Sequence, residues 1–521
     1  MAAVPGLLAP LRRVAPHVLG PRLPAPAALW AAHGRRALSA SVCVTAPLAL
    51  FVLLDRADLG AAAALGGFTA VYGHALPYRR RSVVSAGVGA ALVAAVAVGG
   101  LAGPHPFLLA AVLGLLGAAA TAATAVWQVG PPGPLMAVLV GGSASALGSS
   151  PDLVGQHVAA AAGSAAFAWL VVMAAWTWDP AGPERRAVAA AESAVAGAER
   201  GGLRDTRPDG VARAVRLAHQ AVAGGSRRRP SLRPRLEEVE TRFLRALPTT
   251  APPAHADHRT APAPAPARGH TPLWLPTAVR IGVGAWAAGS LAAALGLHSP
   301  YWAATAAVAV LLGTDARHTR ARALHRVTGT LLGTAVTALL FWSDLPVGVT
   351  VALIGVMLVG VELLVVSQYV LAVSLITPVS LSLVHLGAGS PPGADLIAVR
   401  LGETLVGIVV GLAAGLLLLP HPGSRRLAAA VEATVARALT AVAAAPGGPA
   451  DAALRDSLVA QHEVATATRA ELFAAPGADL QLRRSRQVAD LGWALLGARA
   501  RDEDVLAAWV AARISDDLAP R

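Results

Sequence analysis

The sequence predicts an all-α polytopic membrane protein with two parallel six-helix transmembrane repeats, about 12 spans in all, and helical cytoplasmic regions. Three observations lead to this prediction. The 521 residues are 55% hydrophobic and only 14% charged, with a mean hydropathy of +0.56, whereas soluble domains carry about 25% charged residues. The charged residues lie between long apolar runs, as they do in membrane proteins. A short motif that ends the first set of runs also ends the second.

The apolar runs form two sets, one on each side of a charged middle segment. A transmembrane helix needs about 20 apolar residues, and fewer where other helices shelter it. The first set lies at 37–54, 59–75, 82–101, 106–127, 132–148 and 153–177, and the second at 273–297, 300–314, 327–342, 346–365, 367–386 and 394–420. Each run is predicted to be one span.

Arginines mark one side of the membrane. They flank alternate runs at Arg35, Arg36, Arg79, Arg80, Arg81, Arg185, Arg186, Arg317, Arg320, Arg322, Arg326, Arg425 and Arg426. These positions share one side if each set has six spans, and the positive-inside rule then places both termini in the cytoplasm. The lysine-free composition, rich in Ala, Gly and Pro, indicates a GC-rich bacterial genome, so the bacterial cell (inner) membrane is the expected location.

The two sets of runs end alike. An Arg-Arg pair follows the sixth run and leads to Glu192, and another follows the twelfth run and leads to Glu432. The last run of each set begins with Asp-Leu, at Asp152 and Asp395, and both matches recur at nearly the same separation. With six spans in each copy, the copies are parallel repeats related by an axis along the membrane normal.

The remaining segments complete the expected domain organisation. We expect a cytoplasmic leader at 1–36, a first transmembrane repeat at 37–177, a cytoplasmic helical region at 178–246, a Pro/Ala-rich linker at 247–272, a second transmembrane repeat at 273–420 and a cytoplasmic helical tail at 421–521. Apolar residues recur at helical spacing in 183–246, and the tail is expected to pack against that region. The linker histidines, His255, His258 and His270, are interpreted as solvated residues and not as metal ligands.

Composition excludes several classes of function. The net charge of +13 resides on arginines that flank apolar runs without interleaved aromatic residues, so nucleic acid is not an expected partner. The absence of lysine excludes a P-loop ATPase and Schiff-base catalysis. Cys43 is the only cysteine, which excludes multi-cysteine metal sites. We expect no cofactor, no metal and no enzymatic activity.

Besides Asp395 at the very start of the last run, four charged residues lie within predicted spans, where an unpaired charge costs about 2.5–3.5 kcal/mol on insertion scales. Arg400 and Glu403 are three residues apart in the last run and therefore share a helix face. Arg280 lies in the seventh run and Glu362 closes the tenth. In a transporter, Arg400 and Arg280 would bind a carboxylate, and Glu403 and Glu362 would titrate. Alternatively, Arg400 and Glu403 form an ion pair that fixes helix packing, and Arg280 extends to the headgroups.

Several motifs in the second set of runs resemble the fusaric acid resistance protein-like, or aromatic acid exporter-like, family of membrane transporters. They are Tyr301-Trp302, Arg326-x-x-Gly329-Thr330-x-x-Gly333, Tyr369, Ile376-Thr377-Pro378 and Arg400-x-x-Glu403-Thr404-x-x-Gly407. The glycines also form a small-residue face that permits close helix packing. The first set looks like a degenerate copy, in which His157 stands near the position that corresponds to Arg400.

The resemblance implies an efflux transporter for organic acids, in particular aromatic acids, that is driven by protons or by the membrane potential. A passive anion channel and a non-transporting membrane scaffold remain alternatives. The expected partners are the lipid bilayer and a small organic anion, and small-residue helix faces permit a homodimer without requiring one.

Overall fold

The computed structural model describes residues 25–130, 132–201, 208–225, 232–247, 274–312, 316–343, 345–388, 394–418, 424–469 and 477–518. Every regular element in these ranges is a helix. The chain divides into two compact units. Unit 1 comprises Met1–His74, Arg81–Ala175 and Thr271–Leu419, and unit 2 comprises Ala75–Arg80, Trp176–His270 and Pro420–Arg521. Most of the predicted leader and nearly all of the predicted linker lie outside the described residues.

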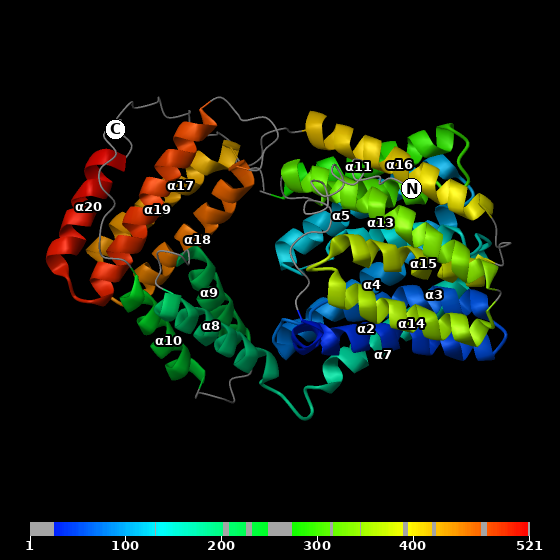
Figure 1. Cartoon of the computed structure of the whole chain (residues 1–521), viewed down its shortest axis with the longest axis horizontal. Helices are drawn as coiled ribbons and strands as arrows, with labels where there is room; N and C mark the ends of the chain where they lie inside the picture. Colours follow the sequence, from blue (N-terminus) through cyan, green and yellow to red (C-terminus); the bar gives the residue numbers. More distant parts are fainter. Residues whose placement is uncertain are drawn as a thin grey trace, which may run out of the picture. The chain divides into compact units, whose positions relative to one another are not determined.

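Each of the twelve predicted spans overlaps one helix of the described residues, counting α3 and its 3₁₀ extension η1 as one (Figure 1). Helix α2 begins at Pro26, so the end of the predicted leader 1–36 belongs to the first helix. The first set is α2 (Pro26–Leu53), α3 (Ala57–Gly67) with η1 (Phe68–Val71), α4 (Tyr78–Ala102), α5 (Pro106–Trp127), α6 (Leu135–Ser145) and α7 (Pro151–Ala174). The second is α11 (Leu275–Ala294), α12 (Tyr301–Leu311), α13 (Ala316–Trp342), α14 (Val347–Leu364), α15 (Tyr369–Ala388) and α16 (Ala394–Leu417).

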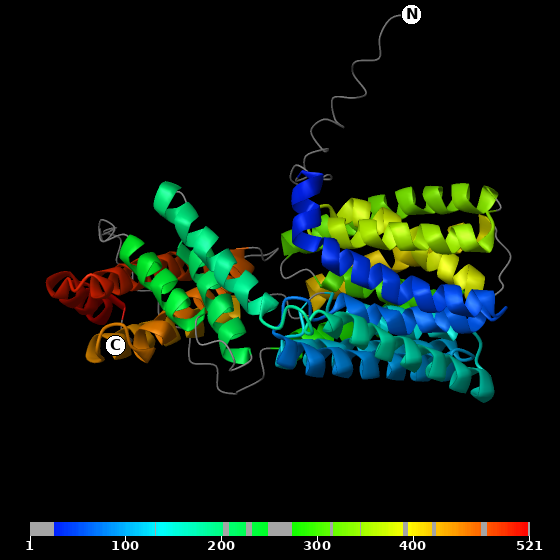
Figure 2. The same ribbon diagram turned by 90° about the horizontal axis from the view of Figure 1, so that it is seen from below.

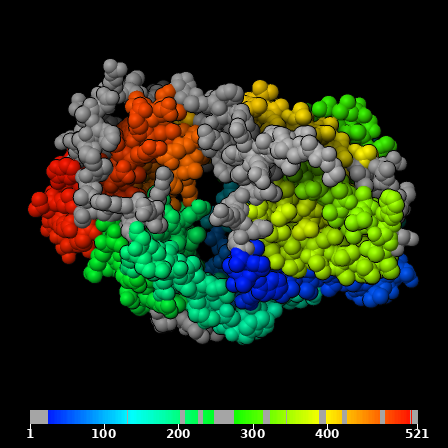
Figure 3. Space-filling view, in the orientation of Figure 1, coloured from blue at the N-terminus to red at the C-terminus, as the bar shows by residue number. Residues whose placement is uncertain are grey.

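Eight of these helices, among the described residues, are long and apolar enough to cross a membrane: α2, α4, α5, α7, α13, α14, α15 and α16. Their exposed side chains are apolar too, for example Leu115 at 71%, Val356 at 69% and Trp342 at 88% exposure. Such a surface is unfavourable in water but suits contact with lipid. Part of it, over α14, α15 and the adjoining α2, is seen in Figure 3. The chain is a multi-pass helical membrane protein.

Three helices of unit 1 are too short to cross a bilayer alone. Both α6 and α12 have 11 residues, which at 1.5 Å per residue is about 16 Å, roughly half the hydrocarbon thickness. Every residue of α12 is buried, as are Gly60–Gly67 of α3 and Met136–Ala144 of α6. Long helices pack around them, so protein and not lipid surrounds their ends.

Contacts between helices follow the same scheme in both sets. Helix α2 packs along α14, and α11 packs along α5 (Figures 1 and 2). Helix α3 packs against α7 and α15, and α12 packs in the same way against α16 and α6. Each set therefore contributes its first helix to contact with the fourth helix of the other.

Unit 2 is a separate helical body. It contains α8 (Gly182–Gly201), α9 (Pro208–Gly224), α10 (Leu232–Ala246), α17 (Ser424–Ala443), α18 (Pro449–Arg469), α19 (Ala478–Ala500) and α20 (Asp504–Leu518). One apolar core includes Val195 and Phe243 from the middle segment and Leu427 and Leu458 from the tail. The expected packing of the tail against the middle segment is thus confirmed.

A partly buried ion pair joins the two parts of unit 2. Arg455 of α18 donates to Glu240 of α10, and His219 of α9 contacts the other oxygen of that carboxylate at 2.7 Å. Burial lowers the pKa of Arg455. Glu192 instead pairs with Arg235 near the surface of the same unit.

Candidate functional site

The candidate site lies where α12, α13 and α16 pack together inside unit 1. Glycines of the sequence motifs allow this close packing. A Cβ atom on Gly407 would lie 2.2 Å from the backbone oxygen of Ala303, so only glycine lets α16 approach α12 this closely. Gly329 and Gly333 face α15 in the same way, against Val373 and Thr377. The motif glycines thus hold neighbouring helices in place around the polar residues.

Arg400 is fully enclosed in the site, with 2% of its surface exposed. Its guanidinium carbon lies 3.5 Å from the centroid of the Trp302 ring, which is a cation–π contact. Its Nε and Nη1 atoms are buried and have no hydrogen-bond partner in the described structure. The tryptophan thus positions the charge and leaves hydrogen-bond donors available.

Glu403 is 0% exposed and binds the turn that precedes α12. One carboxylate oxygen, Oε1, accepts a 2.6 Å hydrogen bond from the backbone N–H of Ser299, while Oε2 is buried without a hydrogen-bond partner among the described residues. Arg400 and Glu403 share a helix face, yet no ion pair joins them in the described structure, because Trp302 and Ser299 hold them separately.

The same cluster contains a second arginine, Arg326 of α13. The sequence assigns it to the cytoplasmic edge of a span, but α13 begins earlier than predicted and Arg326 is only 5% exposed. Its Nε is buried without a hydrogen-bond partner in the described structure, and its charge repels that of Arg400.

Buried hydroxyl groups lie on the same three helices. The Oγ1 atoms of Thr330 and Thr404 and the phenol oxygen of Tyr301 are buried, and the described structure gives none of them a hydrogen-bond partner. Thr330 and Thr404 each stand four residues after an arginine, Arg326 and Arg400. The repeated Arg-x-x-x-Thr spacing is the sequence signal that could have identified Arg326 and Thr330 as site residues.

Arg280 is not brought to this cluster. Gly284, one turn further along α11, lies beside Ala414, where a Cβ on the glycine would be 3.5 Å from the Ala414 Cβ. Ala414 stands about 21 Å along α16 from Arg400 at 1.5 Å per residue. Arg280 therefore lies toward the opposite end of the helix pair.

Glu362 also lies outside the cluster. It is 6% exposed and forms an ion pair with Arg36, with 2.6 Å between Oε2 and Nε. Because Arg36 belongs to α2 and Glu362 to α14, this pair joins helices from the two sets. Its charge is already balanced, which favours a packing role.

The corresponding region of the first set is different. His157 is 2% exposed and its Nε2 lies 3.9 Å from Asp58, whose carboxylate also accepts two hydrogen bonds from Arg56. Arg81 of α4 donates to the backbone oxygens of Gly73 and His74. The buried arginine of this set is therefore satisfied by protein groups, unlike Arg326.

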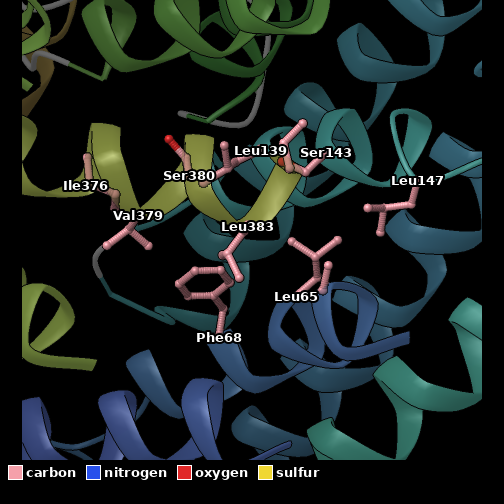
Figure 4. Close-up of a pocket in the computed structure, with 11 residues that line it drawn as sticks. Leu65, Phe68, Leu139, Ser143, Leu147, Ile376, Val379, Ser380 and Leu383 are labelled. Atoms are coloured by element: carbon pink, nitrogen blue, oxygen red, sulfur yellow. The ribbon is translucent and has the colours of Figure 1, made fainter. Parts of the chain in front are cut away.

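A separate small cavity lies among α3 with η1, α6 and α15 (Figure 4). Its lining is apolar, including Leu65, Phe68 and Leu383, apart from Ser143 and Ser380. The volume is about 20 Å³, which is room for a water molecule. An organic acid does not fit there in this conformation.

Comparisons with known proteins match the same region of the chain. Residues 285–414 match the family "Fusaric acid resistance protein-like". This part of the chain is therefore similar to that family. The match includes Tyr301, Arg326 and Arg400, so the resemblance expected from the motifs is confirmed.

The chain is also similar to "Uncharacterized membrane protein YvaC" of Bacillus subtilis (strain 168). The two are 37% identical over 155 residues, which is 29% of this chain and 24% of the relative. The alignment thus spans about a quarter of the length of that relative. No solved structure matches significantly. Among the described residues, no group of three or more His, Cys, Asp or Glu side chains could hold a metal ion.

Proposed function

We propose that this chain exports small organic acids across the bacterial cell membrane and binds their carboxylate at the cluster of Arg326 and Arg400. The observation that carries the proposal is the excess of buried donors in this cluster. Each buried donor without a partner costs about 1–3 kcal/mol. A carboxylate accepts several hydrogen bonds at once and suits the planar fork of arginine, so it would relieve this cost.

The proposed arrangement is twelve membrane segments in two parallel repeats, with both termini in the cytoplasm. The matching helix contacts support it, because α2 with α14 repeats α11 with α5, and α3 with α15 repeats α12 with α6. The buried short helices α3, α6 and α12 lie where the two sets contact each other, and a pathway would form there.

Replacement of Arg400 tests this function. Cells that produce the protein and are loaded with radiolabelled benzoate should retain less label than cells without it. Arg400→Ala should abolish this difference while the protein still inserts in the membrane. Arg280→Ala is the matched control, because that arginine lies far along the bundle, and it should retain export.

The same assay separates the alternatives. Undiminished export by Arg400→Ala would contradict the assignment of the site. Equal retention of label with and without the wild-type protein would favour a membrane scaffold. Large benzoate currents across a planar bilayer would favour a passive channel, because carriers turn over too slowly to produce them.

A further inference from the structure

The charges in the Arg326–Arg400 cluster do not balance. Two guanidinium groups, those of Arg326 and Arg400, carry two positive charges, and Glu403 carries one negative charge when ionised. Among the described residues, Tyr301 also acts on Arg400 and Glu403, and the buried hydroxyls of Thr330 and Thr404 on the same helices are neutral. The enclosed site therefore has a net charge of +1 with Glu403 ionised and +2 with Glu403 neutral.

Because the site is buried, the difference between a net charge of +1 and +2 strongly affects which anion binds. Arg400 and Glu403 are 2% and 0% exposed, so water screens them little. An isolated charge in a protein interior is strongly unfavourable unless an opposite charge accompanies it. The most stable ligand is therefore the one whose negative charge equals the positive charge left in the site.

The groups that face Glu403 are known from the structure. Arg400 acts on it from its own helix, Tyr301 lies nearby on α12, and the Ser299 backbone binds one carboxylate oxygen. Arg326 acts on the cluster from α13. Since none of the other described side chains that act on the cluster is acidic, Glu403 is the described residue that can offset an arginine charge there.

We infer that Glu403 sets the charge of the transported acid. With Glu403 ionised the site takes a singly charged carboxylate, and with Glu403 neutral it also takes a doubly charged one. This inference rests on the proposed function. It also gives Glu403 a role in selectivity and not in proton exchange for the acid, because a proton on Glu403 strengthens anion binding. By linkage, the bound anion strengthens proton binding equally.

Two acids built on the same ring test the inference. Benzoate carries one carboxylate and phthalate carries two, and both are fully ionised at neutral pH. In liposomes that contain the full-length protein, the wild type should transport benzoate at least about tenfold more efficiently than phthalate. Glu403→Gln should shift this ratio toward phthalate by at least about tenfold, since it removes a like charge from the neighbourhood of the second carboxylate.

Two variants serve as controls. Glu403→Asp keeps the charge and should keep the preference for benzoate. Glu362→Gln also removes a buried carboxylate, but one that pairs with Arg36 outside the site, so its benzoate-to-phthalate ratio should equal that of the wild type. A ratio that does not change in Glu403→Gln, while the wild type transports benzoate, would overturn the inference and leave the proposed function standing.

The remaining outcomes are equally decisive. If the wild type transports neither acid, both the proposed function and the inference fail. If Glu403→Gln transports neither acid, the binding of labelled phthalate to the purified variant tests the inference instead. Tighter phthalate binding than in the wild type supports the inference, and equal or weaker binding overturns it.

Discussion

At the scale of single residues, the site depends on how Arg400 is held. A buried arginine is usually fixed by a carboxylate. Here the Trp302 ring takes that position, 3.5 Å from the guanidinium carbon, and Glu403 binds the Ser299 backbone instead. A cation–π contact orients the guanidinium without neutralising it, so its charge remains available to a ligand.

Replacement of Trp302 tests this role. A desolvated cation–π contact contributes about 2 kcal/mol, so Trp302→Leu should reduce the transport efficiency for benzoate by about thirtyfold, at about tenfold per 1.4 kcal/mol. Trp302→Phe retains an aromatic face and should lose less. Initial rates in liposomes measure both variants. Equal losses in the leucine and phenylalanine variants would show that ring volume, and not the aromatic face, matters.

At the scale of helices, glycine decides how closely the elements of the site approach. On α16, Gly407 faces the backbone of Ala303 on α12, whereas a Cβ on Gly402 would meet nothing within 4 Å. The two glycines belong to one helix but serve different ends. Gly407 allows the close contact between α16 and α12. Gly402 makes no contact that requires glycine, so alanine, which is a better helix former, would fit at that position.

Alanine at these two positions should therefore have opposite effects. Gly407→Ala overpacks the contact between α12 and α16, which should lower the free energy of unfolding by about 1–3 kcal/mol. Gly402→Ala should raise it by up to about 1 kcal/mol through helix propensity. Thermal unfolding of the purified variants in detergent gives both values. A neutral result at Gly407 would mean that α12 can move aside without cost.

The helices could be predicted from sequence more fully than the contacts of the site. The apolar runs and their flanking arginines predicted the approximate positions of the twelve described helices of unit 1. They could do so because a helix that contacts lipid or other membrane helices needs an apolar surface. The partners of the charged residues could not be predicted. Glu362 pairs with Arg36 across more than half the chain, and Arg326 lies inside the bundle because its helix starts earlier than the apolar run.

At the scale of the whole molecule, the repeated contacts of the two sets contrast with the chemistry of their buried groups. Helix α4 presents Arg81 to backbone oxygens, whereas α13 presents Arg326 to the cluster with Arg400. The first set thus repeats the helix contacts of the second, but backbone oxygens of the first set accept the hydrogen bonds of Arg81. This pattern supports a single anion site, in the second set, with the first set as its structural counterpart.

The charge of that site predicts what drives export. A monoanion with Glu403 ionised and a dianion with Glu403 protonated both carry one net negative charge out of the cell. An inside-negative potential favours this movement by about 2.3 kcal/mol per 100 mV, which corresponds to about a fiftyfold gradient. An outside-acidic pH gradient does not favour it, because any proton on Glu403 would leave with the acid.

Liposomes with a potassium diffusion potential set by valinomycin separate these two forces. Efflux of benzoate from inside-negative liposomes should follow the potential, and it should persist when a strong buffer at the same pH on both sides abolishes the pH gradient. It should slow when equal potassium on both sides collapses the potential. Liposomes that contain Arg400→Ala correct for passive leak of the protonated acid. Efflux that follows the pH gradient at zero potential, beyond this leak, would contradict the charge balance of the site and favour proton exchange.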